Sequence, residues 1–131
     1  MIKSKKILTA ILVKKANRGN NMKVGIVGSR NLMIYDLENY LPKECEKIIS
    51  GGAVGIDRCA AEYAIRHGID LEEFLPDYKK YGRAAPIVRN KIIVDASDMV
   101  IAFWDGSSKG TKMVIEYCEK TDKKCVVVKV V

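Results

Sequence analysis

The chain of 131 residues has few aromatic side chains, a single histidine and no long apolar run. No apolar stretch approaches the roughly 20 residues that a membrane-spanning helix needs, so we expect none. The lone His67 precedes Gly68 at the end of an expected helix, where the helix dipole favours it, and no Ser-His-Asp or Cys-His set accompanies it. Few aromatic rings are available to stack on bases, which argues against a binder of single-stranded nucleic acid.

The four cysteines, at positions 45, 59, 118 and 125, form no CxxC pair and have no neighbouring histidine suited to zinc. We therefore expect no metal site. All four fall within expected helices or strands, which favours reduced thiols in a cytoplasmic protein.

Positive charge is concentrated at one end of the chain. The formal net charge is +7, and residues 1–21 contain six Lys and Arg residues and no acid, so the remainder carries only +1. The basic character thus belongs to an extension and not to a face of the fold, which disfavours nucleic acid as a partner. We expect one domain over residues 22–131.

The basic extension has three possible interpretations. Its charged start and the apolar stretch 7–13 weakly resemble a signal peptide, although no A-x-A cleavage site follows. It is also compatible with a short amphipathic segment that binds an acidic surface. We favour the third interpretation, in which Met22 is the functional start, because the globular pattern begins there.

From position 23 onward, strand-like and helix-like periods alternate. Short β-branched or apolar runs predict strands, and 3.6-residue periods predict helices; the strands are 23–27, 48–50, 71–75, 99–104 and 125–130, and the helices are 35–47, 56–67, 86–96 and 109–121. This alternation predicts a single Rossmann-like α/β domain, with a five-stranded parallel sheet in the order 3-2-1-4-5 and helices on both faces. The apolar edge at 126–128 is available to a second copy, so a homodimer is a further expectation.

Three glycine-bearing turns follow the first, second and fourth strands, at 27–30, 50–55 and 105–111. Glycine permits positive φ, and a helix N-terminus offers unpaired N–H groups to an anion. The predicted topology gathers all three turns at one carboxyl edge, which predicts a site for a phosphate-bearing small molecule. Neither GxGxxG nor a Walker ending is present, so a standard NAD enzyme or P-loop ATPase is disfavoured.

The motifs at 28–30, 50–57, 89–90 and 103–111 together resemble the SLOG superfamily, and most closely its small YspA and cpYpsA-related branch. The element at 51–57 is similar to that of the DNA-processing protein DprA (Smf). The Gly-Thr pair at 110–111 is similar to that of the LOG phosphoribohydrolases. The resemblance implies a Rossmann-like domain that binds or senses nucleotides or nucleotide-derived ligands.

Candidate binding residues in the first two turns each have a simpler alternative. Arg30, beside Gly28 and Ser29, is expected to pair with phosphate, the alternative being an exposed loop arginine. The glycines of the second turn either cradle the ligand or allow tight strand-to-helix packing; they are Gly51, Gly52 and Gly55. Asp57 is assigned to a ribose hydroxyl or to helix capping.

Further candidates come later in the chain. The resemblance implies that Arg89 and Asn90 face the site, whereas such a pair in a helix is usually solvated. Trp104 is expected either to stack on a base or to pack at the strand end. The third turn offers N–H and hydroxyl groups for a second phosphate site, or it is an ordinary helix start; its residues are Gly106, Ser107, Ser108, Gly110 and Thr111.

Catalysis has weaker support. The LOG hydrolases carry a glutamate three residues after the threonine of their Gly-Thr motif, where this chain has Val114; Glu116 lies about 200° further around the helix and is expected to point elsewhere. The remaining candidate carboxylates are Asp57, Asp105 and Glu116. The sequence therefore predicts a binding or sensing domain for a nucleotide-derived ligand, with an N-glycosidic hydrolase as the alternative and DprA-like binding of single-stranded DNA as a third possibility.

Overall fold

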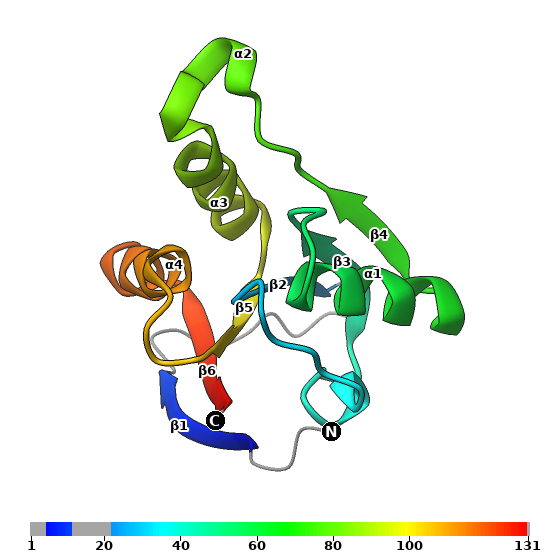
Figure 1. The fold of residues 1–131 in the computed structure, drawn as a ribbon. Coiled ribbons are helices and arrows are strands. Elements are labelled where there is room, and N and C mark those ends of the chain that lie inside the picture. The colour runs from blue at the N-terminus through cyan, green and yellow to red at the C-terminus, as the bar shows by residue number, and fades with distance from the viewer. Residues whose placement is uncertain (1–4, 12–21, 131) are drawn as a thin grey trace.

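A computed structural model describes residues 5–11 and 22–130 of the chain, shown in Figure 1. The described residues form one six-stranded sheet with helices on both faces. The strands are β1 (Lys5–Ile11), β2 (Met22–Gly28), β3 (Cys45–Ser50), β4 (Asp70–Glu73), β5 (Met99–Trp104) and β6 (Lys124–Val130). The helices are η1 (Leu37–Asn39), α1 (Ile56–His67), α2 (Tyr78–Tyr81), η2 (Gly82–Ala84), α3 (Ala85–Ala96) and α4 (Lys109–Lys120).

Five strands, β2 to β6, run parallel, and their order across the sheet is β4-β3-β2-β5-β6. This is the predicted order 3-2-1-4-5, so the Rossmann-like fold is confirmed. The central pair, β2 and β5, aligns Val24 with Met99 and Gly28 with Phe103. From β2 the chain first adds strands on one side, β3 and β4, and then adds β5 and β6 on the other side. In open α/β sheets, ligands bind at the point where this direction switches.

Successive residues of β3 show how the two faces are covered. Ile48 and Ile49 are both fully buried and, as neighbours in a strand, point to opposite faces. Ile48 belongs to a core cluster that includes Ile56, Ala60 and Ala64 of α1. Ile49 belongs to a second cluster that includes buried residues of α3 and α4. The continuous apolar run of β5 is buried over five of its six residues because it lies between these two layers.

The predicted helix at 35–47 is wrong. This segment contains only the short 3-10 helix η1, and its end from Cys45 onward forms β3. Pro42 lacks the N–H that a helix interior needs, and Asp36 and Asn39 favour turns. The apolar spacing that suggested a helix arises because the loop itself packs onto the core through Leu37, Tyr40 and Leu41.

The other helices agree more closely with expectation. Helix α1 has the predicted bounds, and Gly68 ends it at φ 67°. The segment between the predicted strand at 71–75 and the predicted helix at 86–96 contains α2 and η2 before α3 begins.

The expected free edge of β6 is paired within the chain. Residues 5–11 of the basic extension form β1, which lies antiparallel to β6 with Lys5 opposite Val130 and Ile11 opposite Cys125. The rest of the extension, and with it most of its alternative interpretations, lies outside the described residues. All four cysteines are free thiols, and only Cys45 is not fully buried. Within the described ranges, no helix is long and apolar enough to cross a bilayer.

Candidate ligand-binding site

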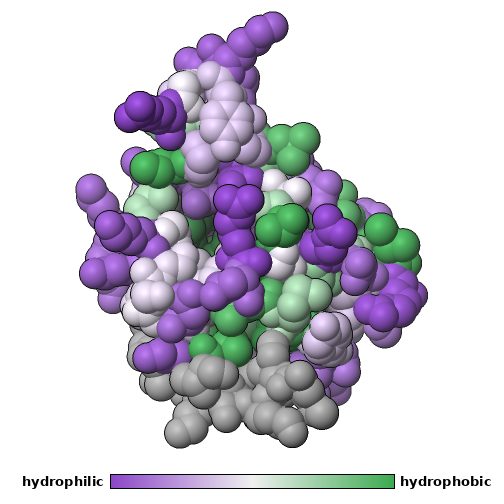
Figure 2. Space-filling model, viewed as in Figure 1, coloured by the Kyte–Doolittle hydropathy of each residue, from purple (hydrophilic) through white to green (hydrophobic). Residues whose placement is uncertain are grey.

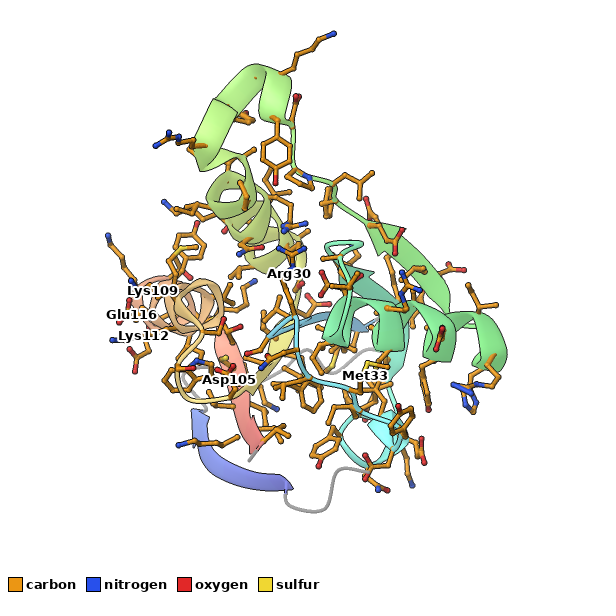
Figure 3. The ribbon with its side chains drawn as sticks, in the orientation of Figure 1. Arg30, Met33, Asp105, Lys109, Lys112 and Glu116 are labelled. Atoms are coloured by element: carbon orange, nitrogen blue, oxygen red, sulfur yellow. The ribbon has the colours of Figure 1, made fainter. Side chains whose placement is uncertain are left out.

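A cavity of about 410 Å³ lies at the carboxyl edge of the parallel strands. It is bounded by the turns after β2 and β3, by the segment between β4 and α3, and by the first turns of α4. Figure 3 shows Arg30 above the end of β2, in the space between α1, α3 and α4. The lining residues are Val27, Gly28, Arg30, Gly51, Gly52, Ala53, Asp57, Leu75, Pro76, Tyr78, Pro86, Arg89, Asn90, Ile93, Ser108, Gly110, Thr111 and Val114.

The turn after β2 contributes a cation and no helix N-terminus. Arg30 is exposed and lines the cavity, whereas the segment after it is the irregular loop that replaces the expected helix. Ser29 is 2% exposed; its N–H donates to the Phe103 carbonyl (3.1 Å), and its hydroxyl accepts from the Asp105 N–H (3.3 Å). Ser29 therefore ties the first turn to the third and does not line the cavity.

Close packing explains the glycine that begins this turn. A Cβ on Gly28 would lie 2.4 Å from a side-chain carbon of Ile56, the first residue of α1. Only a residue without a side chain allows α1 to approach β2 so closely.

In the turn after β3, side chains from two helices hold the backbone. The Asp57 carboxylate accepts from the Ala53 N–H at 3.1 Å, and the Arg89 guanidinium donates to the Gly51 carbonyl at 2.7 Å. A Cβ on Gly51 would lie 2.6 Å from the Arg89 guanidinium and 2.9 Å from the Asp57 carboxylate. Gly51 is thus required for this packing, while Gly52 is exposed and borders the cavity.

Asp57 is a mostly buried carboxylate, 8% exposed, on the cavity wall. Burial raises its pKa above the ordinary value, and the Ala53 N–H and the Arg89 guanidinium partly oppose that shift. In this geometry Asp57 stabilises the turn before α1 through the Ala53 N–H, and it also lines the cavity.

Arg89 and Asn90 both line the cavity, so this pair is not a solvated helix face. Arg89 Nε donates to Asn90 Oδ1 at 2.8 Å, and its Nη1 donates to the carbonyls of Gly51 and, at 3.4 Å, of Phe74. Arg89 therefore connects α3 to the ends of β3 and β4. With its oxygen engaged, Asn90 can present its amide N–H groups to a ligand.

The third turn is organised by Asp105. Its carboxylate accepts from the N–H groups of Ser107 (2.9 Å) and Ser108 (2.7 Å), and these bonds lower its pKa. Trp104 Nε1 donates to the Ser108 carbonyl at 3.0 Å. Asp105, Trp104, Gly106 and Ser107 shape this turn without lining the cavity, as does Gly55 in the second turn.

The N-terminus of α4 reaches the cavity through Ser108, Gly110 and Thr111. Ser108 is the N-cap, and its hydroxyl accepts from the Thr111 N–H at 3.5 Å. The first turn of a helix leaves backbone N–H groups without intrahelical acceptors. These groups and the helix dipole favour an anion at this end of the cavity.

Val114, 1% exposed, lies on the cavity wall one turn further along α4. The position at which the LOG hydrolases carry a glutamate is therefore directed at the cavity but is apolar here. Glu116 is exposed and does not line the cavity; Figure 3 shows it with Lys109 and Lys112 on the outer side of α4.

Several lining residues were not predicted from the sequence. Pro86 and Ile93 come from α3, and Leu75, Pro76 and Tyr78 come from the segment between β4 and α3. The available signal was positional, since this segment also follows the carboxyl end of a parallel strand. Its one glycine, Gly82 at φ 59°, does not line the cavity, so the glycine turns of the sequence do not point to this segment.

Part of the chain is similar to a known protein family. Residues 11–72 match the family model of DNA recombination-mediator protein A, DprA, which belongs to the SLOG superfamily. The match covers just under half of the chain; it includes β2, β3, α1 and the first two glycine turns, and it excludes α3, β5 and α4. No curated protein and no solved structure matches the chain.

Proposed function

We propose that this protein binds a nucleotide or a nucleotide-derived small molecule in the cavity at the carboxyl edge of its sheet, as a sensing or binding domain of the SLOG type. One observation carries the proposal: Arg30, the turn at 51–53 and the N-terminus of α4 all line the same cavity. The match to DNA recombination-mediator protein A over residues 11–72 supports it at the level of the superfamily. Membership of the YspA-related branch is part of the same proposal and rests on the motifs alone.

The phosphate would lie between Arg30 and α4. An exposed guanidinium forms bidentate bonds with phosphate, and the free N–H groups at the start of α4 complete an anion site. Thr111 adds a hydroxyl donor on the same wall, because its Oγ1 accepts from the Ser108 hydroxyl at 3.3 Å and keeps its own hydrogen for a ligand.

The size and polarity of the cavity fit such a ligand. Small-molecule sites range from roughly 300 to 1,000 Å³ and combine apolar walls with a few convergent polar groups. Here the volume is about 410 Å³, and apolar residues such as Pro76, Pro86 and Ile93 face the polar set. A mononucleotide fits this arrangement, because its aromatic base suits the apolar residues and its charged phosphate suits the polar ones.

Thermal shift with the full chain tests the proposal directly. The panel comprises nucleoside monophosphates, cyclic nucleotides, ADP-ribose and NAD, and a ligand at 100 times its dissociation constant stabilises the fold by about 2.7 kcal/mol. Arg30→Ala should abolish the shift. Arg66→Ala is the matched control, because Arg66 is an exposed arginine in the last turn of α1 and does not line the cavity. An unchanged shift in Arg30→Ala would contradict the assigned site.

A second candidate function, N-glycosidic hydrolysis, is favoured by Asp57, because a mostly buried carboxyl with a raised pKa on a cavity wall is suited to proton transfer. Water would add across the bond between base and ribose, releasing the free base. Val114 at the LOG glutamate position counts against it. Product analysis on any ligand that stabilises the protein decides the question, because release of base that Asp57→Asn prevents supports hydrolysis and binding without turnover supports a sensor.

DprA-like binding of single-stranded DNA is the third possibility. Residues 22–131 carry a net charge of only +1, which gives a weak electrostatic term for a nucleic-acid backbone. Affinity for oligonucleotides that persists at high salt would favour this function over the first.

A further inference from the structure

The segment from Leu75 to Pro86 forms an overhang at one end of the cavity. Four of its residues line the cavity: Leu75, Pro76, Tyr78 and Pro86. Leu75 is 67% exposed and Tyr78 61% exposed, so two large side chains that favour burial are left in water at the cavity rim. Apolar surface gathered at the mouth of a cavity is typical of a ligand-binding wall.

The overhang has a defined conformation, although it is short. Asp77 caps α2, its carboxylate accepting from the Lys80 N–H at 3.1 Å, and its carbonyl accepts from the Tyr81 N–H at 3.0 Å. At the other end, Ala85 is fully buried, and Pro86, the second residue of α3, has a restricted φ that suits the first turn of a helix. Figure 1 shows α2 projecting beyond α3 at the tip of the molecule. Tyr78, the first residue of α2, is therefore held in place and is not at the middle of a free loop.

The charge of the overhang is complementary to a phosphate ester. Lys79, Lys80 and Arg83 accompany one acid, Asp77, between positions 77 and 84. Figure 2 shows hydrophilic residues around this tip of the molecule. Such a rim draws anions toward the cavity mouth.

Trp104 is not available for stacking. Its indole N–H is bonded to the Ser108 carbonyl, and its side chain does not line the cavity. Among the described aromatic residues, Tyr78 is the one that lines it. Tyr81 lies three residues further on, outside the cavity, with the Lys80 ammonium 5.2 Å from its ring centre.

We infer that Tyr78 is the platform on which the ligand's aromatic base stacks, so that a mononucleotide spans the cavity with its base under α2 and its phosphate between Arg30 and α4. This inference rests on the proposed function and adds the direction of the ligand and the residue that recognises its ring. Base stacking on an aromatic side chain contributes about 1–3 kcal/mol per base. Because an aromatic ring on the ligand is needed for stacking on Tyr78, the site binds nucleotides more tightly than sugar phosphates.

The experiment compares two probes by calorimetry on the full chain: the nucleoside 5′-monophosphates AMP, GMP, CMP and UMP, and ribose 5-phosphate, which has no base. Tyr78→Ala should weaken the binding of the nucleotides by about 5- to 150-fold. The same variant should leave the affinity for ribose 5-phosphate unchanged. Tyr78→Phe keeps the ring and should bind as the unaltered chain does, and Tyr81→Ala is the matched control.

The outcomes separate the inference from the proposal beneath it. If the nucleotides bind and Tyr78→Ala binds them equally well, the stacking role is wrong and the binding function stands. If Tyr78→Ala weakens both probes alike, the residue only shapes the cavity, and the inference is again wrong. If neither probe binds the unaltered chain, the inference is wrong, and the proposed function is wrong as well when no member of the thermal-shift panel stabilises the protein. If an oligothymidylate binds through Tyr78 and Tyr81 alike, the overhang is a nucleic-acid surface, which overturns the mononucleotide assignment.

Discussion

At the scale of single residues, the candidate side chains divide into those that face the cavity and those that hold the turns around it. Arg30, Asn90 and Thr111 face it, whereas Ser29 is bonded to the backbone of the third turn and the Asp105 carboxylate to backbone N–H groups of its own turn. A hydroxyl residue occurs in each set, because a hydroxyl that can bind a ligand is equally able to accept from a nearby N–H.

Asp57 gives a prediction for the pH dependence of stability. Burial raises its pKa in the folded state above 3.8, so the stability it contributes is present below that value and is lost as pH rises through the folded pKa. The Asp57→Asn variant has no charge to bury and keeps an oxygen for the Ala53 N–H. Its free energy of unfolding, relative to that of the unaltered chain, should therefore increase as pH rises from about 4 to 7.

Urea unfolding of both proteins across that pH range is the measurement. Arg89 and Glu73 are the charged groups that affect Asp57, with opposite signs, and both are present in the two proteins. A relative stability of the variant that falls as pH rises would show that the attraction of Arg89, and not burial, dominates.

At the scale of elements, α1 shows how two glycines with positive φ delimit one helix for different reasons. Gly55 precedes it at φ 76°, ψ −128°, where a Cβ would lie 2.3 Å from the Arg30 carbonyl oxygen. Gly68 ends it at φ 67°, ψ 30°, with no atom within 4 Å of the Cβ position. Gly55 allows the second turn to pack against the backbone of the first, whereas Gly68 is required only by the left-handed backbone conformation at the end of α1.

Substituting alanine at each position separates these two costs. Gly68→Ala carries only the left-handed backbone penalty, about 1 kcal/mol. Gly55→Ala adds a backbone clash in a conformation that is more restricted still, and we expect a loss of at least about 2 kcal/mol together with weaker nucleotide binding, because Arg30 moves. Denaturant unfolding of both variants checks the prediction, and equal losses would contradict it.

At the scale of the whole molecule, the sheet is extended by β1, which covers the β6 edge, whereas the described residues that line the cavity all lie between Val27 and Val114. Pairing with β1 therefore stabilises an edge of the sheet that does not line the cavity. An uncovered β6 would present a row of unpaired backbone groups, which promotes pairing with another chain.

A shortened chain of residues 22–131 tests this separation and the interpretation of Met22 as the functional start. We expect it to fold and to bind nucleotide, but to lose about 2 kcal/mol or more of stability with the β1–β6 hydrogen bonds and to self-associate. Circular dichroism and light scattering over a range of concentrations measure both effects. Loss of folding would show that β1 is an obligatory strand and would exclude the start at Met22.

The strand order, the bounds of α1 and the gathering of glycine turns at one edge can all be predicted from the sequence. These are local or topological properties, set by the period of apolar residues, by glycine and by the rules of parallel sheets. The same local reasoning failed at 35–47, where a loop that packs on the core imitates the spacing of a helix.

Which of the candidate residues face the cavity depends on contacts between segments that are far apart in the sequence. Ser29 and the Asp105 N–H that it accepts from are 76 residues apart, and Arg89 and the Gly51 carbonyl are 38 residues apart. No local pattern contains such pairings, and they engage Ser29 in a turn while directing Arg89 and Asn90 to the cavity wall. The position of Tyr78 depends on the same cause, because the overhang meets the glycine turns only once the sheet has formed and α3 has packed against it.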